Sequence, residues 1–294
     1  MLALVAGRGT LPNLVAQAAA PDVVVCALQD QSPYTLRVDL TFRLETLGSF
    51  LLQLGQRGVT EVCFCGAIDR PQLIPERLDD ETKPLVPVLI DALGKGDDGA
   101  LRAVISLFEK TGFNVRGAHE LTPKVLLQAG TPTTRKQRPY HEDDAKLAWQ
   151  TIAEMGRLDL GQACIVRKGK VLAREDESGT DSMLAANALA WVDHPGLWRD
   201  NTDELTVEAV AWCQRLRAEN HHAPGAGSVL CKAPKPDQDR RADLPTIGSD
   251  TAVSAALAGC DGFVFQELSV IVLEDARVVA LLDAMDMFLW VRAP

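Results

Sequence analysis

Hydrophobic and polar positions alternate between two kinds of segment in the first part of the chain. Short apolar runs predict strands, and the amphipathic stretches between them predict helices, which is the pattern of a parallel sheet covered on both faces. The predicted strands are residues 2–6, 23–28, 62–65 and 113–116, and the predicted helices are residues 11–20, 44–54, 86–93 and 100–110. The pattern therefore predicts an α/β fold that begins with a Rossmann-like parallel-sheet domain over residues 1–121.

The pattern changes over residues 122–141, which contain three prolines and four threonines. This composition predicts a solvated interdomain linker, and Arg135, Lys136 and Arg138 give it a basic run that suits anionic lipid. Beyond it, residues 142–155 and 181–191 predict helices, and the two apolar runs between them predict a hairpin that turns at Lys168-Gly169. Further predicted strands and helices continue to residue 291. The chain is therefore predicted to end in a second α/β domain over residues 142–294.

Composition restricts the class of protein. The chain has 294 residues, 47% hydrophobic and 24% charged, which is typical of a soluble globular protein with two domains. A net charge of -10 argues against general binding of nucleic acid, so an anionic ligand must meet a local cluster of cations. The seven cysteines include no CxxC pair and predict neither a disulfide framework nor a zinc site. With no signal-like start and no apolar run near ~18 residues, we expect a cytoplasmic protein, with peripheral contact to the inner membrane left open.

Residues 231–248, with the sequence CKAPKPDQDRRADLPTIG, bring cations and carboxylates together between prolines. The basic side chains suit phosphate oxygens and the carboxylates suit magnesium, while the prolines reduce the entropy lost when a ligand binds. A solvated surface loop is the alternative interpretation. The basic residues are Lys232, Lys235, Arg240 and Arg241, and the acidic residues are Asp237, Asp239 and Asp243.

Glycine-rich segments precede several predicted helices, where backbone amides can approach a phosphate. A tight turn or simple capping of the helix is the alternative for each of them. Another glycine, Gly66, follows a buried strand and is itself followed by Ala67, at the end of a sheet where ligands commonly bind. The helix-preceding segments contain Gly7, Gly9 and Thr10; Lys95, Gly96, Asp97 and Asp98; and Gly179, Thr180 and Asp181.

The remaining motifs argue against a nicotinamide cofactor and against a zinc protease. The dinucleotide fingerprint GxGxxG requires glycine where the chain has Pro12, which disfavours a nicotinamide cofactor although Asp30 lies near the usual ribose-binding position. His119, predicted at the end of the fifth strand, lacks the second histidine of a zinc protease motif, and it is expected to bind substrate or to fix the linker. Gln162 flanks the predicted hairpin. The other histidines, at positions 141, 194, 221 and 222, are predicted to lie on the surface.

The order of these motifs resembles the UDP-2,3-diacylglucosamine pyrophosphatase family of the LpxI type over nearly the whole chain. The motifs that carry the resemblance are AGRGTLP, FCGAIDRP, GKGDDGALR, VRGAHE, GRLDLGQ, ESGTD and KAPKPDQDRRADLPTIG. The resemblance implies hydrolysis of the substrate's pyrophosphate to UMP and 2,3-diacylglucosamine 1-phosphate (lipid X), in lipid A biosynthesis in a Gram-negative bacterium. It also implies a Rossmann-like domain, a linker and a C-terminal domain of the LpxI type, with lipid X held between the domains.

The resemblance assigns the catalytic role and a magnesium-like ion to Asp243, in the DLPTIG motif. Asp181, in the ESGTD motif, is also expected as a metal ligand, because its position at the start of a predicted helix leaves it available to a metal ion or as a base. Arg8 and Ser178 depart from residues common in the family. A non-catalytic nucleotide-sugar or lipid carrier remains the alternative function, a homodimer is left open, and the sequence does not decide which phosphorus is attacked. The substrate-binding residues expected from the motifs and the resemblance are Gly7, Gly9, Thr10, Gly66, Ala67, Lys95, Gly96, Asp97, Asp98, His119, Gln162, Gly179, Thr180, Lys232 and Lys235.

Overall fold

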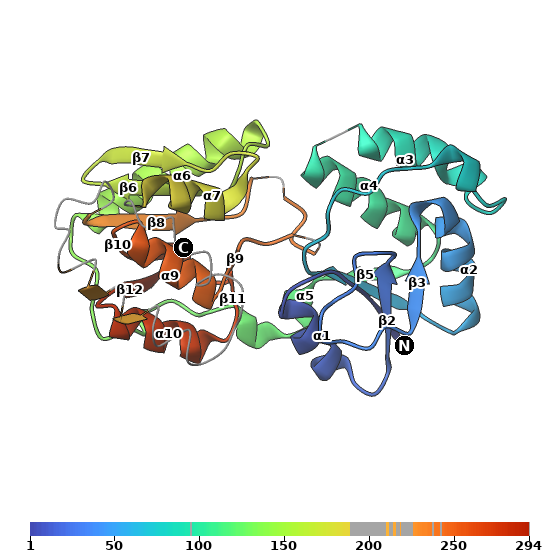
Figure 1. Cartoon of the computed structure of the whole chain (residues 1–294), viewed down its shortest axis with the longest axis horizontal. Coiled ribbons are helices and arrows are strands. Elements are labelled where there is room, and N and C mark those ends of the chain that lie inside the picture. The colour runs from blue at the N-terminus through green and yellow to red at the C-terminus, as the bar shows by residue number, and fades with distance from the viewer. Residues whose placement is uncertain are drawn as a thin grey trace. The chain divides into compact units, whose positions relative to one another are not determined.

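The chain was analysed as a computed structural model that divides into two compact units (Figure 1). Unit 1 is Met1–Lys124 with Gln238–Leu244, and unit 2 is Val125–Asp237 with Pro245–Pro294. The charged segment 231–248 is therefore shared between the two units. None of the described helices is long and apolar enough to cross a membrane. The structure describes residues 1–94, 96–188, 210–211, 214–215, 218, 226–236, 238–241 and 243–293.

Unit 1 is built on a parallel sheet with the strand order β3-β2-β1-β4-β5. This is the order expected of a Rossmann-like sheet, and it confirms the predicted fold class. Because all the strands are parallel, the turns after β1, β2, β3 and β4 lie along one edge of the sheet. The strands are β1 (Leu2–Ala6), β2 (Val23–Leu28), β3 (Leu40–Phe42), β4 (Glu61–Cys65) and β5 (Asn114–Arg116).

Helices cover both faces of this sheet, which explains why its strands are apolar along most of their length. On one face, Phe50 of α2, Leu89 of α3 and Phe108 of α4 pack in one core cluster with strand residues. On the other face, Val15 of α1 and Ala118 of α5 pack in a second cluster. The helices are α1 (Leu11–Ala19), α2 (Leu47–Gln56), α3 (Val86–Leu93), α4 (Asp97–Lys110) and α5 (Ala118–Leu121), with short 3₁₀ helices at Leu44–Thr46, Pro75–Arg77, Lys83–Leu85 and Pro123–Val125.

Unit 2 contains a mixed sheet with the strand order β12-β10-β8-β6-β7. Strands β8, β10 and β12 are parallel to one another, whereas β6 runs antiparallel to both β8 and β7. The predicted hairpin is confirmed, and Lys168 and Gly169 at its turn both have positive φ. The strands are β6 (Ala163–Arg167), β7 (Lys170–Arg174), β8 (Ser228–Lys232), β10 (Cys260–Gln266) and β12 (Phe288–Arg292), and β9 (Thr246–Ile247) pairs separately with β11 (Ile271–Val272).

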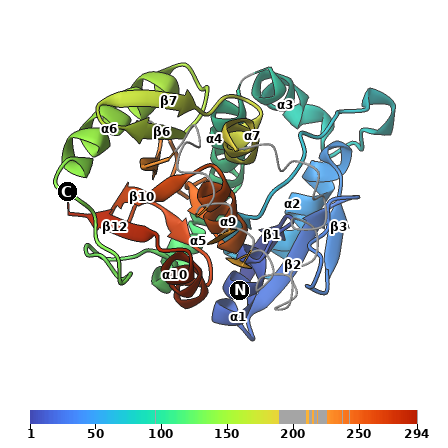
Figure 2. The ribbon, with the colours of Figure 1, turned by 60° about the vertical axis from the view of Figure 1, so that its left-hand side comes forward.

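Helices also cover both faces of the sheet of unit 2 (Figure 2). Along β6, Ala163 and Ile165 pack in the cluster that contains α7, α9 and α10, while Cys164 and Val166 pack against α6. This period of two is the side-chain alternation of a strand buried on both faces. The helices are α6 (His141–Arg157), α7 (Gly179–Asn187), α9 (Ser249–Leu257) and α10 (Asp275–Ala284).

The segment between the two predicted domains is anchored at several points, and about half of its residues are exposed. Thr133 is fully buried, and its Oγ1 accepts a hydrogen bond of 2.9 Å from the amide of Leu289 in β12. Arg135 donates to Asp261 at 2.8 Å, and Lys136 donates to backbone carbonyls within its own segment. Arg135 thus ties this segment to β10, and Lys136 bonds within the segment; both are cations that sequence analysis offered to anionic lipid.

His141 corrects the prediction of a surface histidine. Its side chain is 1% exposed at the start of α6, Nδ1 accepts a hydrogen bond of 3.0 Å from the amide of Arg138, and its ring centroid lies 4.7 Å from that of Phe288. The sequence pattern missed it because the core contact is made across the sheet by a residue far along the chain. The histidines at positions 194, 221 and 222 lie outside the described residues.

The burial of His141 predicts a dependence of stability on pH. Burial lowers the pKa of His141 below its ordinary value of 6.5, with Arg135 and Arg138 acting in the same direction and Asp144 and Asp261 opposing it. The unfolded chain therefore binds a proton below about pH 6.5 that the folded chain resists, so the free energy of unfolding should fall as the pH decreases through that range. Urea unfolding at pH 7.5 and 5.5 would test this, and His141→Asn should show the smaller loss. An equal loss in both proteins would contradict it.

Candidate active site

The turns after β1 and β4 cross at very short distance in unit 1. The amide of Arg8 donates to the carbonyl of Ala67 at 2.8 Å, the amide of Ala67 donates back to Arg8 at 2.9 Å, and the amide of Gly7 donates to Cys65 at 2.9 Å. A Cβ atom on Gly7 would lie 2.5 Å from the carbonyl oxygen of Ala67. The glycines at positions 7 and 66 thus allow two strand-end turns to pair, and the amides of Gly7, Arg8 and Ala67 are used in that pairing.

Replacing Gly66 by alanine is expected to destabilise unit 1. Gly66 has φ of +92°, and a Cβ atom there would lie 2.7 Å from the carbonyl carbon of Gly7. Left-handed strain and a backbone clash together should cost about 3 kcal/mol of unfolding free energy. Gly58→Ala is the matched control, because Gly58 also has positive φ but has open space around it. Urea unfolding should show a clearly larger loss of unfolding free energy for Gly66→Ala than for Gly58→Ala. Equal losses would show that the close approach of the two turns is not the cause.

Arg8 and Asp69 join the same two turns through their side chains. The guanidinium donates to both carboxylate oxygens at 2.6 and 3.0 Å, and this hydrogen bonding lowers the pKa of Asp69. The side-chain amide of Gln31 is paired with the backbone of Asp69 in both directions, which connects this turn to the end of β2. Gly9, with φ of +106°, and Thr10 then lead into α1.

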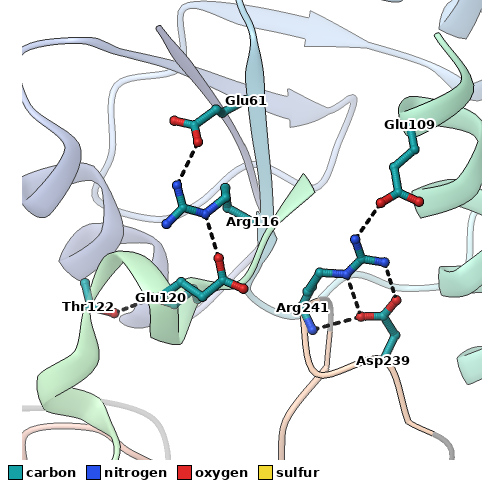
Figure 3. A network of polar contacts seen from close by, with 8 residues as sticks. Glu61, Glu109, Arg116, Glu120, Thr122, Asp239 and Arg241 are labelled. Atoms are coloured by element: carbon teal, nitrogen blue, oxygen red, sulfur yellow. Dashed lines mark hydrogen bonds and ion pairs between the residues drawn. The ribbon is translucent and has the colours of Figure 1, made fainter. Parts of the chain in front are cut away.

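Residues 238–244 are anchored in unit 1 by Arg241 (Figure 3). Its guanidinium donates to both oxygens of Asp239, at 3.0 and 2.8 Å, and to Glu109 of α4 at 2.5 Å. Hydrogen bonding to Arg241 lowers the pKa of Asp239, so this carboxylate stays ionised and engaged. Gln238, which is 8% exposed, donates to Oδ2 of Asp243. Arg241, Asp239 and Glu109 thus hold the segment that contains Asp243.

His119 lies beside this segment in unit 1. It belongs to α5, not to the end of β5 as predicted, and α5 is held to the sheet by Arg116, which donates to Glu61 at 2.7 Å and Glu120 at 2.6 Å (Figure 3). A Cβ atom on Gly117, at the start of α5, would lie 3.2 Å from Cα of Arg241. Burial lowers the pKa of His119, and the charge of Arg240 lowers it further. We therefore expect a neutral imidazole at pH 7.

A buried polar chain in unit 2 brings together three residues predicted to bind substrate. Thr180 at the start of α7 donates to Oε1 of Glu175 at 2.6 Å, and the amide of Gln162 donates to Oε2 at 2.7 Å. The ammonium of Lys232 donates to Thr180 Oγ1 at 3.0 Å and to the carbonyl of Thr246 in β9 at 3.1 Å. Glu175, Thr180 and Lys232 are each less than a tenth exposed. The GQ, GTD and KAPKPD motifs thus meet at Glu175, which sequence analysis did not identify.

Two further pairs of charged groups lie in unit 2. Burial raises the pKa of Asp250, at the start of α9, and the negative charge of Asp181 raises it further. These two carboxylates thus interact across the starts of α7 and α9. Lys235 donates to Oδ1 of Asp159, which ties the residues after β8 to the turn before β6.

Several residues that were predicted to bind substrate or metal lie wholly or partly outside the described residues. Lys95 and Asp237 are not among the described residues, and Gly96, Asp97 and Asp98 lie at the start of α4 with the two aspartate side chains undescribed. The described cysteines are free and buried, and hydrogen bonding with Cys63 together with burial raises the pKa of Cys65. These cysteines are therefore poor nucleophiles.

The residues present are compatible with a magnesium ion bound mainly through substrate. Within the described ranges, no three His, Cys, Asp or Glu residues form a group that could hold a metal ion. Magnesium does not require such a cage, because it is usually bound by one or two carboxylates together with the phosphates of the substrate. Asp243 is a carboxylate of this kind, and its Oδ2 accepts a hydrogen bond from Gln238, while both oxygens of Asp239 accept from Arg241.

These features define a two-domain α/β protein that joins a Rossmann-like sheet to a mixed sheet with a buried Lys-Thr-Glu chain. The family model for the LpxI N-terminal domain matches residues 1–125, and that for the LpxI C-terminal domain matches residues 128–290. The UDP-2,3-diacylglucosamine pyrophosphatase LpxI of Caulobacter vibrioides (strain ATCC 19089 / CIP 103742 / CB 15) is 35% identical over 292 residues, which cover 98% of this chain and 95% of that protein. The chain belongs to the LpxI family.

Proposed function

We propose that this protein hydrolyses the pyrophosphate bond of UDP-2,3-diacylglucosamine, giving UMP and 2,3-diacylglucosamine 1-phosphate in lipid A biosynthesis. The observation that carries the proposal is the 35% identity, over 98% of the chain, to a protein named for that activity. The anchored Asp243 and the cationic Lys232 and Lys235 support it, because phosphoryl transfer needs carboxylates and positive charge near the reacting phosphates.

Asp243 is proposed as the key acidic residue of the reaction. Water attacks one phosphorus of the pyrophosphate, the bond from that phosphorus to the bridging oxygen breaks, the bridging oxygen leaves on the other phosphate, and the protons of the attacking water pass to solvent. Lys232 and Lys235 offset the negative charge that develops on the phosphate oxygens. A neutral His119 can donate or accept a hydrogen bond to the substrate. Asp243 and Asp181 would hold a magnesium ion, which when bound withdraws charge from the phosphate oxygens.

The first experiment is phosphorus NMR of the purified protein with UDP-2,3-diacylglucosamine, in magnesium and in excess chelator. The expected result is loss of the pyrophosphate signals and appearance of UMP and a sugar 1-phosphate in magnesium only. Turnover that persists in chelator would overturn the metal part of the proposal. Tight binding with an intact pyrophosphate would replace the hydrolase by a carrier, and no binding would overturn the proposed substrate.

A further inference from the structure

The hairpin formed by β6 and β7 is strongly basic in an acidic chain. Residues 167–174, with the sequence RKGKVLAR, contain four cations and no acidic residue, whereas the whole chain has 40 acidic and 30 basic residues. These residues, called the basic hairpin below, lie at the edge of the sheet of unit 2, where β7 is the last of the described strands (Figure 1). Lys168, Lys170 and Arg174 are exposed, and Arg167 is half-buried. The mechanism proposed above uses none of them.

A buried carboxylate fixes the turn of the basic hairpin. The two oxygens of Asp144, at the start of α6, accept hydrogen bonds from the amides of Lys168, at 3.0 Å, and Gly169, at 2.6 Å. The charge of Asp144 offsets one of the four cations, so an excess of positive charge remains. The ammonium groups of Lys168 and Lys170 have no hydrogen-bond or ion-pair partner among the described residues. The basic hairpin therefore presents exposed cations on a fixed backbone.

The cations at the turn are unfavourable for the stability of the hairpin itself. Lys168 has φ of 46° and Gly169 has φ of 74°, the backbone of a two-residue turn in which Asn-Gly is a favoured sequence. Arg167 and Lys170 are register partners on either side of this turn, and like charges at directly opposed positions destabilise a strand pair. Positive charge is thus placed where local structure disfavours it, which indicates a role outside the fold.

The proposed substrate favours an anionic bilayer as the partner of this surface. A diacylated sugar is an amphiphile that resides in a bilayer, so the protein must meet it at a membrane surface. Lysine and arginine side chains are attracted to anionic headgroups, and this attraction extends only about 8 Å at physiological ionic strength. The acidic residues elsewhere on the chain therefore do little to oppose a contact made by the basic hairpin alone. The hairpin contains no aromatic residue that could stack on a base, so a nucleic acid is the less favoured partner.

We propose that the basic hairpin docks the protein on the anionic phospholipids of the membrane that holds its acylated substrate. Lys168 and Lys170 at the turn, with Arg174 on the edge strand, contact the phosphate groups of the lipids. This surface is distinct from the segment at 122–141, where two of the three cations offered to lipid are hydrogen-bonded within the protein. The inference rests on the proposed function for the acylated nature of the substrate.

Flotation of the full chain with lipid vesicles tests the docking. The wild-type protein should float with vesicles of phosphatidylethanolamine and phosphatidylglycerol at low salt, should be released at high salt, and should not float with phosphatidylcholine alone. Lys168→Asn combined with Lys170→Gln should lower the partition coefficient by about 10- to 30-fold, because both substitutions remove a cation from the surface. Asparagine suits the left-handed backbone at position 168, so this hairpin variant should fold.

The matched control is Lys110→Gln combined with Lys124→Gln, which removes the same charge from exposed positions in unit 1. It should float as the wild-type protein does. Equal losses in the two double variants, or equal flotation of the wild-type protein with anionic and phosphatidylcholine vesicles, would overturn the inference. Tighter binding of an RNA oligonucleotide than of anionic vesicles at the same salt would assign the basic hairpin to nucleic acid and would overturn it as well.

Turnover measurements separate this inference from the proposed function. The hairpin variant should hydrolyse UDP-2,3-diacylglucosamine in neutral detergent micelles as fast as the wild-type protein, and more slowly when the substrate is supplied in anionic vesicles. Turnover in micelles without flotation would overturn the docking surface and keep the hydrolase. Flotation that depends on the basic hairpin, in a protein without turnover in micelles, would keep the docking surface and overturn the proposed hydrolysis.

Discussion

Asp243→Asn is expected to lower the turnover of UDP-2,3-diacylglucosamine by about 100- to 1000-fold while leaving the fold unchanged, because it removes the carboxylate charge proposed to hold magnesium at the reacting phosphates. The amide has the shape of the carboxylate, and its oxygen can still accept the hydrogen bond from Gln238. The anchor formed by Arg241, Asp239 and Glu109 does not involve the substituted group. Steady-state kinetics at saturating magnesium, with the melting temperature measured in parallel, would establish whether kcat falls while stability is kept.

Asp239→Asn is the comparison within the same segment. This substitution weakens the hold of Arg241 on its own segment, but Arg241 keeps its bond to Glu109. We therefore expect a lower melting temperature and a much smaller loss of kcat than for Asp243→Asn. If both variants lost turnover equally, the role of Asp243 would be reduced to positioning the segment. Near-normal turnover in Asp243→Asn would exclude it as the key acid.

The sequence predicted the sheet of unit 1 well because burial on both faces makes its strands apolar and continuous. It missed β3, since Leu40–Phe42 is too short to show a period. It placed Cys231 and Lys232 in a charged loop, although they form the end of the buried strand β8. A lysine at the end of a strand is easily assigned to the following loop. Lys232 can be buried because its ammonium donates hydrogen bonds to Thr180 and to the carbonyl of Thr246.

The candidate site was predicted in its components but not in its connections. The motifs identified Gln162, Thr180 and Lys232, yet Glu175 stands in an acidic run that is typical of a solvated turn. Its burial arises only when the end of β7 meets the start of α7, which no local pattern encodes. Asp239 was offered by its residue type as a magnesium ligand, and the structure shows that its carboxylate accepts hydrogen bonds from Arg241, two residues further along. The local sequence pattern predicts the residue types of a site, whereas the tertiary structure decides which contacts those residues make.

Glu175→Ala is expected to lower the unfolding free energy of unit 2 by about 3 kcal/mol, because it leaves buried donors without their acceptor. The amide of Gln162 and the hydroxyl of Thr180 lose their hydrogen-bond acceptor. The ammonium of Lys232, which is 7% exposed, loses the nearby negative charge to which it is linked through Thr180. With Thr180 no longer fixed by Glu175, and Lys232 keeping its bonds to Thr180 and Thr246, kcat should fall more than KM rises. Urea unfolding and steady-state kinetics measure the two effects separately.

Glu175→Gln keeps one acceptor oxygen and should be more stable than Glu175→Ala. It should be less stable than the wild-type protein, because the negative charge of Glu175 near the buried ammonium of Lys232 is lost. Glu177→Ala is the matched control, because Glu177 lies two residues along in the same acidic run and is exposed. We expect Glu177→Ala to resemble the wild-type protein in both measurements. Equal destabilisation by Glu175→Ala and Glu177→Ala would show that the buried chain does not support unit 2. A stability loss in Glu175→Ala with unchanged kcat would show that Thr180 and Lys232 do not act on the substrate through this chain.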